Sequence, residues 1–223
     1  MVKRIGVSIT VLVAWIVFLV CTGIACSRAT NETVHAKSGN TTKETVSMNE
    51  TYTKNTPITD VIKDADFGDF GRLLFPADTG FYSGDTLGNL KLTWYSNIQP
   101  DKTVEIVNTL KTRVENGETV FYDIYTDVEK AADPDKEDTG LFFFQGNPGE
   151  KFAICNAGGG FAYVGAMHDS FPHAMELSKK GYNAFALIYR PGAQTACEDL
   201  ARAIAFIFSH ADELQVDVKE YSL

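Results

Sequence analysis

The sequence has no cluster of Lys and Arg residues. Its 223 residues include 20 basic and 29 acidic side chains, which give a formal net charge of -9 and an isoelectric point near 4.9. A surface that binds nucleic acid gathers basic side chains to neutralise phosphates. The composition therefore argues against nucleic acid as a partner. An acidic surface mainly favours solubility and does not identify a substrate.

Cysteine is also scarce. Beyond the first 26 residues the chain has only Cys155 and Cys197, and two cysteines do not form a disulfide framework. Both lie in apolar stretches of sequence. We therefore expect two buried free thiols and no disulfide bridge.

The apolar run near the N-terminus is short for a membrane span. It extends over residues 5–20, about 16 residues, whereas a transmembrane helix needs roughly 20. Lys3 and Arg4 precede this run, and small residues follow it. The order charged, apolar, small is typical of a secretory signal. Residues 1–26 are therefore predicted to be a signal peptide that directs export, in preference to a permanent transmembrane helix.

The end of this signal resembles that of a bacterial lipoprotein. Small residues lead up to Cys26, the residue that would be lipidated after cleavage, although Gly23 stands where such signals usually carry Leu. Lipidation would anchor the exported protein to a membrane surface, facing outward from a bacterial cell. An ordinary signal peptide or an uncleaved anchor is the alternative.

Residues 27–57 contain few large apolar side chains. They are rich in Thr, Asn, Ser, Glu and Lys, a composition that buries too little surface to offset the conformational entropy lost on folding. We expect a disordered linker here and a folded domain over residues 58–223.

The first half of this domain predicts irregular structure followed by an antiparallel start to a sheet. Alternating apolar residues predict strands, and apolar residues at a spacing of three and four predict helices. The expected elements are turns over 66–89, a strand at 90–95, a helix over 102–115 that ends at Asn116-Gly117, a strand at 119–125, an acidic loop over 127–140, a strand at 141–144 and a turn at 147–149.

The second half alternates between strand and helix. The expected elements are a buried strand at 152–156, a helix over 169–180 that ends at Gly181, a buried strand at 183–189, a helix over 195–214 and a strand that begins near 220. Strand–helix–strand order predicts parallel strands with right-handed crossovers. The fold class is thus α/β, with an antiparallel start, then parallel strands and flanking helices.

Three consecutive glycines, Gly158 to Gly160, follow the buried strand at 152–156. Their backbone can turn sharply, and N–H groups in such a loop can converge on a developing negative oxygen. A tight turn without chemistry is equally consistent with the spacing. A dinucleotide-binding loop would need a small residue at position 163, where Tyr163 stands, and an earlier helix start.

The histidines suggest a metal site only weakly. His168, Asp169 and His173 lie within six residues, but two histidines five apart do not share a helix face. No metal site is therefore predicted. His210 lies near the end of the expected helix over 195–214, where its partial charge suits the helix dipole.

Over roughly residues 140–223 the chain resembles the HGGG class of α/β-hydrolase esterases and lipases. The resemblance is carried by the order of elements and by three segments: NAGGGF (156–161), NAFALIYR (183–190) and TACEDLARAIAF (195–206). The resemblance implies that Gly159 and Gly160 supply backbone N–H groups to an oxyanion hole, and that Gly158 permits the turn. It implies hydrolysis of a small-molecule carboxylic ester without a cofactor. Ala157 replaces the usual His before the glycines.

That family carries its nucleophile in a G-x-S-x-G turn after the strand that follows the long helix. The sequence contains no G-x-S-x-G, and Ser222 lacks both glycines and a following helix. We therefore expect an N-terminal portion of such a hydrolase, truncated before its nucleophile, acid and base and inactive as given. A non-catalytic surface lipoprotein, which uses this part of the fold for binding or structure, is the alternative.

Overall fold

The computed structural model describes residues 51–75, 80–92 and 98–223. The predicted signal peptide, Cys26 and most of the predicted linker lie outside these residues. So do residues 93–95 of the predicted strand at 90–95. No helix in the described part of the chain is long and apolar enough to cross a membrane.

The folded part begins before the predicted boundary at residue 57. Tyr52 is buried, and its backbone N–H donates to Asn108 Oδ1 at 3.0 Å. In return, Asn108 Nδ2 donates to the carbonyl oxygen of Tyr52 at 2.9 Å. The Asn108 amide therefore pairs with this backbone much as a neighbouring strand would. The composition of residues 27–57 predicted disorder and did not indicate that a single aromatic residue, Tyr52, would be buried.

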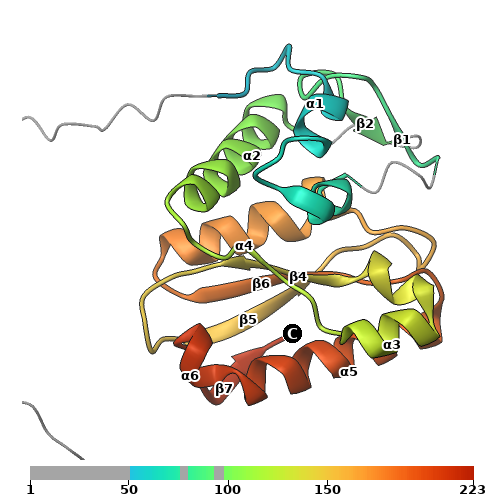
Figure 1. Ribbon diagram of the computed structural model, residues 1–223. Coiled ribbons are helices and arrows are strands. Elements are labelled where there is room, and N and C mark those ends of the chain that lie inside the picture. The colour runs from blue at the N-terminus through green and yellow to red at the C-terminus, as the bar shows by residue number, and fades with distance from the viewer. Residues whose placement is uncertain (1–50, 76–79, 93–97) are drawn as a thin grey trace, which may run out of the picture. The chain divides into compact units, whose positions relative to one another are not determined.

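A five-stranded mixed sheet forms the centre of the fold, in the order β3-β4-β6-β5-β7 (Figure 1). Its strands are β3 (Phe121–Tyr122), β4 (Gly140–Phe144), β5 (Lys151–Asn156), β6 (Asn183–Ile188) and β7 (Asp217–Ser222). β4 is antiparallel to both β3 and β6, whereas β5 is parallel to both β6 and β7. The predicted antiparallel start followed by parallel strands is confirmed. A separate two-stranded sheet pairs β1 (Tyr82–Ser83) with β2 (Lys91–Leu92).

Helices lie on both faces of the five-stranded sheet, with α4 on one face and α5 on the other (Figure 1). The α-helices are α1 (Ile58–Ile62), α2 (Pro100–Glu115), α3 (Asp127–Ala132), α4 (Ser170–Lys179), α5 (Ala193–Ser209) and α6 (Ala211–Leu214). Short 3₁₀ helices are η1 (Gly68–Leu73), η3 (Pro134–Asp138) and η4 (Ala166–His168). The fold is thus an α/β fold, as predicted.

The elements with the clearest apolar patterns form as predicted. All six residues of β6 are buried, because helices cover both faces of the sheet at this strand. β5 also forms, but the prediction that it is buried throughout is wrong: Phe152 and Ile154 are buried, whereas Ala153 and Cys155 are partly exposed. The helix predicted over 102–115 is α2, which has Pro100 in its first turn, ends at Glu115 and is followed by Asn116 as its C-cap.

Three elements differ from the prediction. The acidic loop expected over 127–140 contains α3, which a capping box between Thr126 and Glu129 starts. The strand expected at 119–125 is reduced to β3. The helix expected over 195–214 stops at Ser209, whose hydroxyl bonds back to the Phe206 carbonyl oxygen at 3.0 Å, and continues as the separate helix α6.

A buried ion pair links the end of β6 to α5. Arg190 Nη2 donates to Asp199 Oδ1 at 2.7 Å, and the two side chains are 6% and 0% exposed. The Arg190 backbone N–H also donates to Asp199 Oδ2 at 2.8 Å. The Tyr125 hydroxyl donates to Asp199 Oδ1 at 2.8 Å, and burial followed by this bond raises the pKa of Tyr125 to about 12. Asp199 thus holds three separate segments together.

Removing one member of this pair should be strongly destabilising. Asp199→Ala leaves the Arg190 guanidinium buried without its main partner, which costs roughly 3–5 kcal/mol in such cases. We expect urea denaturation of the whole chain to show a loss of this size in the free energy of unfolding. Glu220→Ala, which breaks the exposed pair of Glu220 with Lys151, is the control and should change the midpoint very little. Similar losses for the two variants would contradict the prediction.

Candidate functional site

The glycine loop begins where a parallel strand ends. β5 ends at Asn156, which lies opposite Leu187 of the parallel neighbour β6. The loops that follow β5 and β6 therefore leave the sheet at the same edge (Figure 1). In α/β sheets this edge, at the carboxyl ends of the parallel strands, is where ligands bind.

Both backbone polar groups of Gly158, the N–H and the carbonyl oxygen, are hydrogen-bonded. Its backbone N–H donates to Asp169 Oδ2 at 2.8 Å, and its carbonyl oxygen accepts from the Gly165 N–H at 2.9 Å. The carbonyl oxygen of Gly159 accepts from the Ala162 N–H at 3.1 Å. The loop after β5 is therefore a closed turn that folds back on its own first residues.

The backbone of this turn requires glycine at one position above all. Gly159 has φ +155°, and a Cβ atom there would lie 1.8 Å from the carbonyl oxygen of Tyr163. Gly160 has φ +61°, but a Cβ atom there would meet nothing within 4 Å. Phe161 also has a positive φ, of 59°. The turn thus excludes a side chain at Gly159 by direct contact and disfavours one at Gly160 by backbone conformation alone.

Two adjacent amides of the turn are available to a ligand. Among the described residues, neither the Gly159 N–H nor the Gly160 N–H has a hydrogen-bond partner. Gly160 is exposed and Gly159 partly exposed. Successive N–H groups in a turn with positive φ values form a concave site for negative oxygen. The Gly158 N–H, which is bonded to Asp169, is not available.

The loops after β5 and β6 support each other. The Tyr189 hydroxyl, at the end of β6, donates to the carbonyl oxygen of Ala157 at 2.7 Å. The Gly192 N–H donates to the carbonyl oxygen of Phe161 at 2.7 Å. Ala157, which stands where the resemblance leads one to expect His, is therefore anchored through its backbone by Tyr189.

The histidines near the turn are not arranged around a metal. No group of three or more His, Cys, Asp or Glu side chains in the described ranges could hold a metal ion. His168 is half-buried, and burial lowers its pKa while the nearby Asp169 acts in the opposite direction. His173 Nδ1 lies 3.3 Å from Asp169 Oδ1. His210 caps the end of α5, where its Nδ1–H donates to the Phe206 carbonyl oxygen at 2.8 Å.

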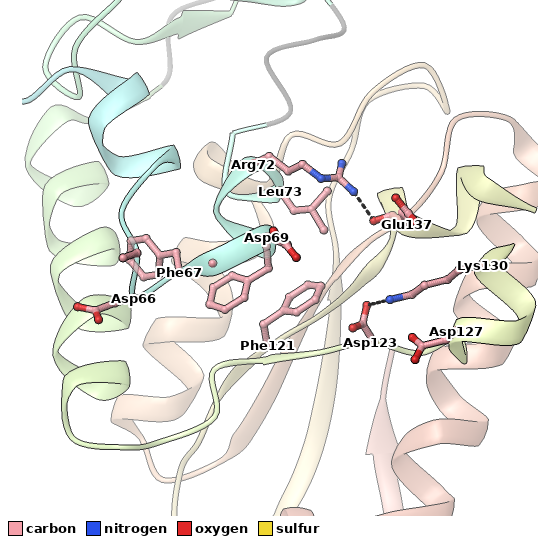
Figure 2. Close-up of a pocket in the computed structure, with 13 residues that line it drawn as sticks. Asp66, Phe67, Asp69, Arg72, Leu73, Phe121, Asp123, Asp127, Lys130 and Glu137 are labelled. Atoms are coloured by element: carbon pink, nitrogen blue, oxygen red, sulfur yellow. Dashed lines mark hydrogen bonds and ion pairs between the residues drawn. The ribbon is translucent and has the colours of Figure 1, made fainter.

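A cavity between η1, β3 and α3 is lined by aromatic and charged side chains (Figure 2). It has a volume of about 650 Å³, and none of its lining residues belongs to the turn. The lining combines carboxylates with aromatic rings, and Figure 2 shows Lys130 paired with Asp123 inside it, at 2.5 Å. Arg72 donates to the Glu137 carbonyl oxygen at 2.6 Å. These cationic groups are therefore bonded to neighbouring oxygens within the wall of the cavity.

Two serines of the described chain, Ser170 and Ser222, lie at the ends of secondary-structure elements. Ser170, the first residue of α4, is buried, and its hydroxyl has no hydrogen-bond partner in the described structure. Ser222 lies at the end of β7, an edge strand of the sheet. Neither hydroxyl has a base to activate it among the contacts of the described residues.

Three comparisons with known proteins were made. No protein-family model matches the chain, and no curated protein sequence matches it. Solved structures that are similar include an acetyl ester-xyloside bifunctional hydrolase from Caldicellulosiruptor lactoaceticus, with 22% identity, a TM-score of 0.40 and coverage of 45% of this chain and 40% of that one.

Two further structures give similar values. The esterase Est2 from Thermogutta terrifontis has 19% identity and a TM-score of 0.36, over 46% of this chain and 38% of that one. The α/β hydrolase MGS-M1, from a Medee basin deep-sea metagenome library, has 19% identity and a TM-score of 0.35, over 45% and 43%. This chain thus spans about two-fifths of the length of the α/β hydrolases and esterases that it resembles.

The two cysteines are free, as predicted, but only one is shielded from solvent. Cys155 on β5 is partly buried, whereas Cys197 on α5 is exposed, which corrects the prediction that both are buried. Burial, with a smaller contribution from the nearby Asp169, raises the pKa of Cys155 to about 11.

Alkylation should distinguish the two thiols. A pKa of about 11 leaves roughly one Cys155 thiol in 1,000 ionised at pH 8. We expect iodoacetamide to modify Cys197 much faster than Cys155 in the native protein, as followed by peptide mass mapping. In urea the two rates should converge, because unfolding removes the burial. Rapid labelling of Cys155 in the native state would contradict the structure.

Proposed function

We propose that this chain is part of an exported α/β-hydrolase of the esterase class, and that its glycine turn stabilises the oxyanion formed during carboxylic-ester hydrolysis. One observation carries the proposal. The adjacent N–H groups of Gly159 and Gly160 are unpaired within the described structure, at the carboxyl end of a buried parallel strand. The HGGG-like order of elements agrees with this role.

The chemistry follows from the position of these donors. When a nucleophile attacks the carbonyl carbon of an ester, the carbonyl oxygen becomes negatively charged. Backbone N–H groups that already point at this oxygen stabilise it without reorganising. Gly158 would shape the turn, because its own N–H is engaged by Asp169. No cofactor is needed for this type of reaction.

Hydrolysis also requires a serine, a histidine and an acid. In the family that the chain resembles, these residues follow the strand after the long helix, in the order serine, acid, histidine, and we expect the same order here. The 223 residues contain no G-x-S-x-G. Ligand binding by the Gly159 and Gly160 N–H groups and turnover of an ester are therefore tested by separate experiments.

The proposed location is the outer surface of a bacterial membrane. The signal-like residues 1–26 would direct export, and a lipid on Cys26 would anchor the protein. Residues between this anchor and the folded part would serve as a tether. The substrate would be a small-molecule carboxylic ester.

Carboxylate binding tests the donors in this chain directly. Propionate presents two negatively charged oxygens and resembles the product of ester hydrolysis. We expect titration of the ¹⁵N-labelled protein with propionate to shift the amide resonances of Gly159 and Gly160 together and to saturate. Propionamide, which has the same shape and no charge, is the control ligand and should shift them less. Unchanged resonances for both glycines would contradict the proposal.

Substitutions in the turn provide matched controls. In Gly159→Ala the Cβ atom collides with the Tyr163 carbonyl oxygen, so the turn must move and the response to propionate should be lost. Gly160→Ala has open space for its Cβ atom and faces only a backbone cost of about 1 kcal/mol. We expect Gly160→Ala to keep most of the response. Equal responses in the two variants would show that the turn is not the binding site.

Turnover is tested on the longest product of the gene. If the reading frame continues into a G-x-S-x-G turn, that product should hydrolyse a short p-nitrophenyl ester. Gly159→Ala should then lower kcat by about 10²–10³, the effect of losing one oxyanion donor. A chain that ends at Leu223 and shows no hydrolysis would favour the non-catalytic surface lipoprotein.

A further inference from the structure

We infer that Asp169 is the positioning residue of the glycine turn, an inference that rests on the oxyanion role proposed above. Its Oδ2 accepts the Gly158 N–H at 2.8 Å across eleven residues of sequence. This bond links the start of the turn to the start of α4. The side chain is 34% exposed, so water competes with the bond only in part.

The bond determines which amides face a ligand. Three successive N–H groups belong to the glycines, and Asp169 occupies the first of them. The Gly158 carbonyl oxygen is held in turn by the Gly165 N–H. With both groups of Gly158 bonded, the orientation of the next two N–H groups is set before a ligand arrives. This is the preorganisation that makes oxyanion donors effective.

Asp169 makes this bond and does not cap the N-terminus of α4. It occupies the residue before α4, where an Asp side chain commonly accepts from an N–H of the first helical turn. Here α4 has no side-chain cap bond at Asp169. The carboxylate reaches away from its own helix to Gly158. A local rule broken in this way often marks a functional position.

The second carboxylate oxygen is also engaged. Asp169 Oδ1 lies 3.3 Å from His173 Nδ1, and the Asp169 carbonyl oxygen accepts from the His173 N–H at 3.3 Å. The carboxylate is thus held between the turn and the first turn of α4. Its negative charge near Gly159 and Gly160 opposes the binding of an anion. The hydrogen bond and the charge of Asp169 therefore act in opposite directions on ligand affinity.

Two substitutions separate these effects. Asp169→Asn keeps an oxygen that can accept the Gly158 N–H and removes the charge. Asp169→Ala removes both. We expect Asp169→Ala to speed hydrogen exchange of the Gly158 amide by about tenfold or more, the effect of losing a hydrogen bond to a charged group, and to weaken propionate binding by a similar factor. Asp169→Asn should keep the slow exchange and bind propionate at least as tightly as the wild type.

The wild type provides a test that needs no variant. Its Gly158 amide should exchange more slowly than those of Gly159 and Gly160, because only Gly158 has a partner. Equal exchange at all three glycines would overturn the inference, as would equal propionate affinity for Asp169→Asn and Asp169→Ala. If propionate fails to bind the wild type, the proposed function fails. The exchange rates of Gly158 in wild type and variants then still decide whether Asp169 holds the turn.

Discussion

The buried pair of Arg190 and Asp199 constrains the loops on which the site depends. A guanidinium and a carboxylate that lose water gain only if every remaining donor and acceptor is paired. Here Asp199 receives the Arg190 side chain, the Arg190 backbone N–H and the Tyr125 hydroxyl. The chain leaving β6 is thereby tied to α5. Because of this tie, Gly192 lies where its N–H reaches the Phe161 carbonyl oxygen, at 2.7 Å.

The glycine turn is consequently supported from three sides. Asp169 holds its first glycine, Tyr189 holds the Ala157 carbonyl oxygen below it, and Gly192 holds its end at Phe161. These three supports come from the residue before α4 and from two residues that follow β6. Glycines alone would make a mobile turn, since they lose more conformational entropy on folding than other residues. The contacts restrict a segment that needs glycine for its shape.

Much of this arrangement could be predicted from local patterns. The apolar run of β6 and the helical spacing of α2 depend on neighbours in sequence, and both elements form as expected. The Thr126 and Glu129 capping box is also a sequence signal for a helix start, but the acidic composition around it suggested a loop. The hydrogen bond from Gly158 to Asp169 could not be predicted from the sequence, because a contact between residues eleven apart across a loop produces no repeating pattern of residues. It depends on the path of the loop between them.

Strand direction explains why the site forms at this edge. β5, β6 and β7 are parallel, so their carboxyl ends share one edge of the sheet, where the loops after β5 and β6 begin. β4 runs in the opposite direction and directs its own loop elsewhere. The 650 Å³ cavity provides volume, and its Arg72 and Lys130 are already bonded to neighbouring oxygens, whereas the turn provides unpaired donors. Chemistry on a developing negative oxygen needs fixed donors more than it needs volume, and for that reason the turn is the stronger candidate.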